Sequence, residues 1–256
     1  MLQGSSCASE REGFAALTQE WRPRFGLLYI PKPGATADAA CGQGYLARNT
    51  IDQRLIDVLR VIQRLRTETW WNHELYVIGT SEGGLMAGLV GAFVPETKRI
   101  AILSYGGART MGEWWPEAVY AHALKESGST VAAEAEREEV IEAFQRARLS
   151  PDSAETFGGA TNTLAWWASI IDVRLLPTLL DVEVPILLVH GTEDPYAPVE
   201  GARGVERAFA AAGKTNLTYR EYAGLNHGFE NAAGESSLER VTQDALLWTL
   251  GPPNGL

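Results

Sequence analysis

The chain has 256 residues, of which 45% are hydrophobic and 21% charged, a size and composition that suit one α/β domain with an insertion or two small domains. Its net charge of −10 argues against binding to nucleic acid or to an anionic membrane surface, because both attract Lys and Arg. Its apolar stretches fall far short of the roughly 20 residues that a membrane-spanning helix needs, so no membrane span is expected.

Short apolar runs alternate with amphipathic helical stretches, which is the pattern of a parallel sheet covered by helices on both faces. Five runs predict strands, in chain order 26–30 (GLLYI), 75–79 (LYVIG), 99–105 (RIAILSY), 185–190 (PILLVH) and 217–222 (LTYREY). The central runs are almost continuously apolar, as in strands buried on both faces, whereas the last alternates like an edge strand.

Helices are predicted between these strands. Ser9 and Glu12 have the spacing of a capping box ahead of a helix that carries Phe14, Leu17 and Trp21 on one face. Regularly spaced apolar residues predict three more helices: Leu55, Val58, Leu59, Ile62 and Leu65; Val199, Ala202, Val205 and Phe209; and Leu238, Val241, Ala245 and Trp248.

Residues 108–184 break the alternation. This segment contains no convincing strand and is far longer than the roughly 2–6 residues that usually join a strand to a helix. A helix is predicted over 131–148, with Ile141 and Phe144 facing inward. We interpret residues 108–184 as a helical cap over one end of a core formed by residues 1–107 and 185–256.

Ser81 lies in the motif Gly79-Thr80-Ser81-Glu82-Gly83, which is G-x-S-x-G and directly follows a predicted strand. A serine on such a sharp strand-to-helix turn takes a strained backbone angle, and the two glycines let the strand and the helix approach each other without Cβ clashes. The positive end of the helix dipole then points at the serine. The motif predicts Ser81 as a nucleophile.

Two further residues complete this prediction. Asp194 follows the strand that ends at His190, and His227 follows the strand at 217–222. Because the carboxyl ends of parallel strands lie on one rim of a sheet, both side chains are expected near Ser81. The order Ser, Asp, His is the order of this arrangement in α/β hydrolases. His190 is expected to be a hydrogen-bonded structural residue and His73 an exposed one.

Four motifs carry a family resemblance: the strand-to-helix turn (elbow) GTSEGG, the turn HGTEDPYAP, the loop NHGF and the start LQGSS. Through them the chain resembles the α/β-hydrolase superfamily, and in particular its small bacterial esterases and prolyl-oligopeptidase-like hydrolases. The resemblance covers nearly the whole chain. It implies an α/β fold with a mostly parallel sheet flanked by helices. It also implies acyl transfer through Ser81, with His227 as general base and Asp194 orienting it. Neither a metal nor an organic cofactor is expected.

The stretch Gln3-Gly4-Ser5-Ser6 matches the place where relatives have His-Gly-x at the end of a strand. The resemblance implies that the backbone N–H groups of Ser5 and Glu82 form the oxyanion hole, with Ser6 as the alternative to Ser5. Because few residues precede Gly4, Met1 to Gln3 are expected to form a stub of a central strand between 26–30 and 75–79. Further residues are expected upstream in the natural product, and a partner chain's strand is the alternative.

Cys7 follows the oxyanion loop, and Cys41 lies in the loop after the run 26–30. Both loops should emerge at the same end of neighbouring strands, within reach of the 4.4–6.8 Å Cα separation of a disulfide. A Cys7–Cys41 disulfide and two free thiols are both open at this point. The bond would indicate a periplasmic or secreted protein, and free thiols would suit the cytoplasm.

The expected substrate is a small-molecule carboxylic ester. Four tryptophans of the expected cap either line an acyl or alcohol pocket or fasten the cap to the core: Trp114, Trp115, Trp166 and Trp167. A peptidase or amidase is the alternative enzyme, with Glu113 and Glu117 as candidates to hold a peptide terminus. A catalytically silent binding module is a third reading. Monomer and homo-oligomer both remain open.

Overall fold

A computed structural model of the protein describes residues 1–36, 41–159 and 161–251. Its centre is a parallel sheet of four strands in the order β1-β2-β3-β4, which is also their order in the chain. The strands are β1 (Leu75–Thr80), β2 (Thr97–Leu103), β3 (Ile186–Gly191) and β4 (Leu217–Tyr222). Four of the five predicted strands and the α/β fold class are therefore confirmed.

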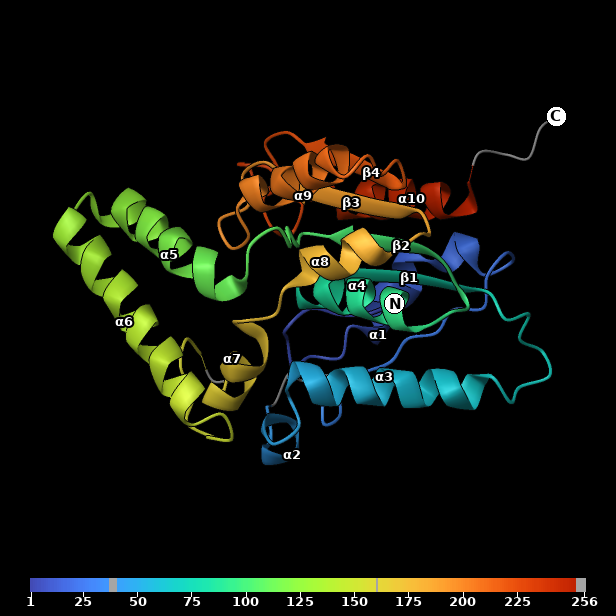
Figure 1. The fold of residues 1–256 in the computed structure, drawn as a ribbon, viewed down its shortest axis with the longest axis horizontal. Helices are drawn as coiled ribbons and strands as arrows, with labels where there is room; N and C mark the ends of the chain where they lie inside the picture. The colour runs from blue at the N-terminus through green and yellow to red at the C-terminus, as the bar shows by residue number, and fades with distance from the viewer. Residues whose placement is uncertain (37–40, 160, 252–256) are drawn as a thin grey trace.

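Helices precede, connect and follow these strands (Figure 1). Ahead of β1 lie α1 (Arg11–Leu17), the 3-10 turn η1 (Gln19–Trp21), α2 (Gln43–Leu46) and α3 (Ile51–Leu65). Then come α4 (Glu82–Phe93) after β1, α9 (Val199–Ala211) after β3 and α10 (Leu238–Leu250) after β4. Between β2 and β3 the chain forms α5 (Met111–Ser127), α6 (Thr130–Leu149), α7 (Leu164–Ile170) and α8 (Leu175–Asp181).

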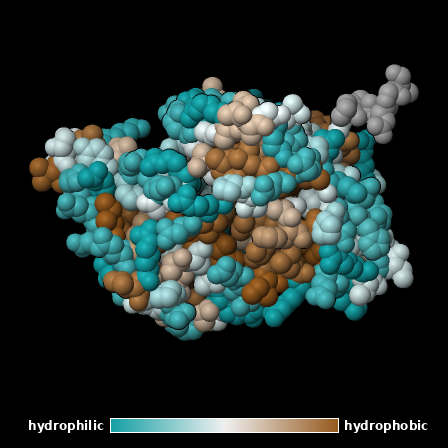
Figure 2. Space-filling view, in the orientation of Figure 1, coloured by the Kyte–Doolittle hydropathy of each residue, from teal (hydrophilic) through white to brown (hydrophobic). Residues whose placement is uncertain are grey.

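The alternation of side chains along the strands divides the core into two layers. Val77 and Ile100 belong to a cluster with apolar residues of α3, α4, α8 and α9, whereas Ile78 and Ala101 pack with residues of α10 and η1. Burying one large aliphatic side chain stabilises a fold by roughly 1.5–3 kcal/mol, so both layers of helices are held by the sheet. Apolar side chains also reach the surface in the middle of the face around α4 (Figure 2).

The helices between β2 and β3 form an insertion, of which α5, α6 and α7 project beside the sheet and α8 lies over it (Figure 1). α5 packs along α6, α6 contacts α7, and α8 packs back on α4. Phe144 is buried as predicted, but Ile141 is 38% exposed, which corrects its predicted inward orientation. The buried stripe of α6 runs through Val140, Phe144 and Ala147 at helical spacing, and Ile141 lies about 100° away from it.

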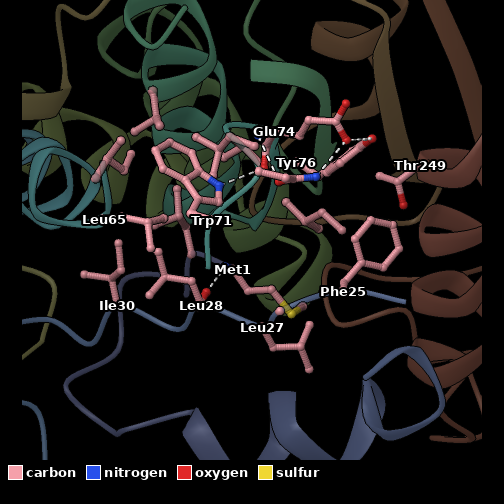
Figure 3. A pocket seen from close by; sticks show the side chains of 18 of the residues that line it. Met1, Phe25, Leu27, Leu28, Ile30, Leu65, Trp71, Glu74, Tyr76 and Thr249 are labelled. Carbon is pink, nitrogen blue, oxygen red and sulfur yellow. Dashed lines mark hydrogen bonds between the residues drawn. The ribbon is translucent and has the colours of Figure 1, made fainter. Parts of the chain in front are cut away.

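The predicted strand over 26–30 does not form. Instead, the Met1 nitrogen donates a hydrogen bond to the Leu28 carbonyl at 2.6 Å, and Leu2 pairs with Gly79 in a single parallel bridge. The stretch Met1 to Gln3 therefore lies between 26–30 and β1, as expected. A single hydrogen bond to residues 26–30 is too few to pair them as a strand of the sheet. A cavity of about 650 Å³ lies beside these residues, with Leu28, Trp71 and Tyr76 among its lining residues (Figure 3).

The start of α1 also differs from the expectation. The capping box of Ser9 and Glu12 does not form, and the helix begins after Glu10 without a side-chain cap. The Ser9 N–H, which a capping box would give to the Glu12 carboxylate, donates instead to the Thr36 carbonyl at 2.9 Å. In the described part of the chain, no helix is both long and apolar enough to cross a bilayer.

Candidate active site

Ser81 sits on the turn between β1 and α4, with φ 55° and ψ −125°. A Cβ on Gly79 would lie 1.8 Å from the Gly83 carbonyl oxygen, and a Cβ on Gly83 would lie 2.1 Å from the Leu2 carbonyl oxygen. Only glycine fits at these two positions, because such distances exclude any side chain. The strained strand-to-helix turn that the motif predicts is therefore confirmed.

His227 lies between Ser81 and Asp194. Its Nε2 is 2.9 Å from Ser81 Oγ, and its Nδ1 is 2.7 Å from Asp194 Oδ2. The three residues follow the carboxyl ends of β1, β3 and β4, so the parallel sheet brings them to one rim. The Ser104 hydroxyl donates to the His227 carbonyl at 2.9 Å, which helps to fix the loop that carries the histidine.

Asp194 is 7% exposed and fully hydrogen-bonded. Its Oδ1 accepts the backbone N–H groups of Tyr196 at 2.9 Å and Ala197 at 2.8 Å, and its Oδ2 faces His227. Burial alone would raise the pKa of Asp194, but the hydrogen bonds from His190 and His227 outweigh it and lower the pKa to about 2. The carboxylate is therefore ionised at neutral pH and suited to stabilise a protonated imidazole.

The two other predicted histidines lie where the sequence suggested. His190 is fully buried at the end of β3, and its Nε2 lies 2.6 Å from the Ala197 carbonyl oxygen and 3.4 Å from Asp194 Oδ2. It thus supports the turn around Asp194. His73 is exposed, before β1.

The loop that begins at Gly4 runs directly beside the serine. A Cβ on Gly4 would lie 3.9 Å from Ser81 Oγ. The buried side chain of Gln3 shapes this loop, because its Nε2 donates to the carbonyls of Ser6 at 3.0 Å and Ala8 at 2.9 Å. Among the described residues, the N–H groups of Ser5 and Glu82 have no hydrogen-bond partner.

Cys7 and Cys41 are joined by a disulfide, with their Cα atoms 5.5 Å apart. The bond ties the end of the Gly4 loop to the segment before α2. The Tyr45 hydroxyl in α2 donates to the Ser5 carbonyl at 3.3 Å, so the same loop is held at a second point.

A family model described as serine aminopeptidase, S33, matches residues 42–232, well over half of the chain. The chain belongs to the S33 family of α/β hydrolases. Three solved structures share its fold at low identity. Est1E from Butyrivibrio proteoclasticus with ferulic acid bound is 17% identical, with coverage of 97% of this chain and 86% of that chain and a TM-score of 0.62.

The second is a monoacylglycerol lipase from Paleococcus ferrophilus, 17% identical, with coverage of 96% and 91% and a TM-score of 0.61. The third is MGS-M2, an α/β hydrolase enzyme from a Medee basin deep-sea metagenome library, 14% identical, with coverage of 100% and 90% and a TM-score of 0.62. These structural similarities show that the chain has the α/β-hydrolase fold.

A buried ion cluster next to the elbow was not predicted from the sequence. The Glu82 carboxylate accepts hydrogen bonds from Lys32 at 3.0 Å, from the Trp166 indole at 2.9 Å and from the Arg54 guanidinium. The four residues are each 5% exposed or less. Burial raises the pKa of Glu82, but the charges of Lys32 and Arg54 outweigh it and hold the pKa below its usual value.

The four predicted tryptophans of this S33-family chain have different environments. Three of them are buried, with exposed fractions of 9% for Trp114, 3% for Trp166 and 2% for Trp167, whereas Trp115 is partly exposed. Trp115 stacks on Tyr196 with ring centroids 6.4 Å apart, and Tyr196 meets His227 edge-on at 5.6 Å. Tyr196 is a residue that the sequence analysis missed, although its place two residues after Asp194 is a usable signal.

Within residues 1–36, 41–159 and 161–251, no three His, Cys, Asp or Glu side chains gather as ligands for a metal ion. The cavity beside Leu28 is lined mainly by residues of the N-terminal stretch, α3, β1 and α10. Ser81, Asp194 and His227 are not among its lining residues. It is therefore separate from the candidate active site.

Proposed function

We propose that this protein hydrolyses small carboxylic esters through a covalent acyl-enzyme on Ser81. The observation that carries the proposal is the position of His227, whose Nε2 is 2.9 Å from Ser81 Oγ while its Nδ1 is 2.7 Å from Asp194. A serine is a weak nucleophile until a base accepts its proton, and these distances lie within the reach that such a transfer requires.

The reaction has two halves. Ser81 Oγ attacks the ester carbonyl while its proton passes to His227 Nε2, and His227 then returns the proton to the departing alcohol. Water attacks the acyl-enzyme in the second half, with His227 again accepting and returning a proton. Asp194 holds the imidazole in the tautomer with Nδ1 protonated and stabilises the imidazolium that forms in each half.

The proposed oxyanion hole consists of the N–H groups of Glu82 and Ser5. The Glu82 N–H stands at the start of α4, where the helix dipole favours negative charge. Support for Ser5 comes from its neighbour Gly4, which lies beside the serine: a Cβ on Gly4 would be 3.9 Å from Ser81 Oγ. Loss of one such donor is expected to cost about 3–4 kcal/mol of transition-state stabilisation.

The insertion acts as a cap in this proposal, and Trp115 with Tyr196 forms one wall of the acyl or alcohol pocket. Trp114, Trp166 and Trp167 are too buried to contact substrate, so they serve to fasten the insertion to itself and to the core. Esters whose acyl or alcohol part can pack against an aromatic wall should bind best.

A peptidase or amidase is the second candidate, favoured by the family description of serine aminopeptidase. The acidic residues considered for holding a peptide terminus argue against it. Glu113 accepts the Thr110 N–H at 2.7 Å, and Glu117 forms an ion pair with Arg109 at 2.7 Å. Both carboxylates already have local partners.

One experiment decides between the two candidates. The purified protein is assayed on p-nitrophenyl butyrate and on an aminoacyl-p-nitroanilide, with Ser81→Ala as the matched control. We expect turnover of the ester, little or none of the anilide, and no activity in the variant. Faster cleavage of the anilide would replace the esterase with the peptidase, and turnover of both substrates by Ser81→Ala would remove both.

A further inference from the structure

Arg54 in α3 makes two buried contacts with one guanidinium. Its Nη1 donates to the Glu82 carboxylate, and its Nη2 donates to the Gln3 carbonyl. Arg54 itself is 5% exposed and Gln3 is fully buried. A charged side chain this deep is costly unless its donors are matched by acceptors, and here two of them reach separate segments of the chain.

These two segments are the ones that flank Ser81. Gln3 is followed by Gly4 and Ser5, and Glu82 directly follows Ser81. The guanidinium is planar and rigid, so the positions of Nη1 and Nη2 fix the distance between its two partners. The distance between the Gly4 loop and the start of α4 is therefore set partly by a side chain that lies outside both.

The other contacts of Glu82 hold its carboxylate at this place. Lys32 Nζ lies 2.9 Å from Oε1 and also donates to Asn49 at 3.1 Å, while the indole of Trp166 in α7 donates to Oε2. Both carboxylate oxygens are thus occupied, Oε1 by Arg54 and Lys32 and Oε2 by Lys32 and Trp166. These contacts hold the side chain of Glu82, the first residue of α4, against Arg54.

We propose that Arg54 is a positioning residue for the oxyanion hole, which it shapes by linking Glu82 to Gln3. The inference rests on the proposed function, because it concerns the N–H groups of Ser5 and Glu82 that would stabilise the oxyanion. An oxyanion hole works only when its donors stand 2.7–3.1 Å from the developing charge, and a misplacement of about 1 Å can cost about 100-fold in rate.

The test replaces Arg54 by lysine, which keeps the charge of the cluster but replaces the rigid, planar pair of nitrogens with a single ammonium on a flexible stem, which does not fix the spacing of its two acceptors. Its matched control is Arg48→Lys, because Arg48, which precedes α3, makes a partly exposed pair with Asp57 at 3.1 Å. Both variants are assayed on p-nitrophenyl butyrate and with 1,1,1-trifluoro-2-heptanone. Addition of Ser81 Oγ to this ketone places an oxyanion in the hole.

We expect Arg54→Lys to lower kcat at least about tenfold, to leave KM within about twofold and to weaken inhibition by the ketone in proportion to kcat. Arg48→Lys should match the wild type in all three. A purely structural role for Arg54 would lower the thermal midpoint without this separation of kcat from KM.

Glu82→Gln gives the same test through the other end of the bridge and serves if Arg54→Lys does not fold. A folded variant of either kind with wild-type kcat and ketone affinity would overturn the inference. Such a result leaves the proposed function standing, since the wild type still turns over the ester. A wild type that neither hydrolyses the ester nor binds the ketone would instead overturn the proposed function.

Discussion

Two buried carboxylates flank Ser81, and their surroundings differ. Asp194 is bound by backbone N–H groups and lies between two imidazoles. Glu82 is bound by an ammonium, a guanidinium and an indole. Both have lowered pKa values despite their burial, so both are ionised at neutral pH.

The partners decide what each acid can do. Imidazole gains and loses a proton near neutral pH, so the carboxylate of Asp194 can respond to charge that appears on His227 during a reaction. The partners of Glu82 are an ammonium, a guanidinium and an indole that take no part in the proposed proton transfer, so in this account Glu82 only holds geometry. In the proposed account, the Asp194 side of Ser81 serves proton transfer and the Glu82 side serves positioning.

The largest effect is expected on the side that transfers protons. His227→Ala should lower kcat on p-nitrophenyl butyrate by about 10⁶-fold, because residues of such a unit fail together. The fold should be retained, since His227 is only partly buried. Steady-state kinetics together with circular dichroism check this, and a folded variant with a few per cent of wild-type activity would exclude His227 as the base.

Asp194→Asn should lower kcat by about 10⁴-fold, far more than Glu82→Gln, because an amide cannot compensate the imidazolium and favours the wrong tautomer. Equal losses in the two variants would remove the distinction between the two acids. Kinetics of both variants on one ester make this comparison.

The pKa of Asp194 also predicts how this variant depends on pH. A native pKa of about 2, below the ordinary 3.8, gives stability that is present above pH 3.8 and lost as pH falls toward 2. The free energy of unfolding should therefore differ between wild type and Asp194→Asn by on the order of 2 kcal/mol at pH 7, and less below pH 4. Urea unfolding at several pH values measures this difference, and a gap that widens on acidification would contradict it.

Removal of the disulfide tests how the Gly4 loop beside Ser81 is held in place. Cys7 and Cys41 are separated by 34 residues, and removing a bond that closes a loop of this size should cost about 3–4 kcal/mol of unfolding free energy. The double variant Cys7→Ser/Cys41→Ser should also lose several-fold in kcat because the Gly4 loop is less constrained. Urea unfolding and kinetics measure both effects, and unchanged stability would show that the bond does not constrain the chain.

The smallest effect is expected at the aromatic wall. Tyr196 is 57% exposed and contacts both Trp115 and His227 through its ring. Tyr196→Ala should raise KM for esters of bulky acids a few-fold and leave esters of acetate nearly unaffected, whereas Tyr196→Phe should match the wild type. A uniform loss of kcat over all esters would assign Tyr196 to the support of His227 and not to binding.

The sequence predicts the Asp194 side of the site better than the Glu82 side. Ser81 and Asp194 follow the apolar strands β1 and β3, and His227 follows the alternating strand β4, so the geometry of a parallel sheet brings them to one rim. Arg54 carries no such signal, because a charged residue within an amphipathic helix is normally expected in solvent. Its burial depends on Gln3 and Glu82, which lie far away in the chain.

The same reason explains the other differences. The run 26–30 has the composition of a strand. A strand forms only where a neighbouring segment supplies a row of backbone hydrogen-bonding groups, and here, among the described residues, the only such bond comes from Met1, to Leu28. Ile141 has the hydrophobicity of a core residue, but the register of α6 against its neighbours turns it outward. Both outcomes depend on partners that periodicity does not reveal.

The most direct test of the account is covalent labelling of the serine. The protein is treated with a fluorophosphonate, with and without prior incubation with 1,1,1-trifluoro-2-heptanone, and the modified peptide is identified by mass spectrometry. We predict a single adduct on Ser81 that forms rapidly in the wild type, slowly in Asp194→Asn and not in Ser81→Ala, and that the ketone prevents. An unlabelled wild type, or an adduct on another serine with Ser81 unmodified, would contradict the assignment of Ser81 as the nucleophile.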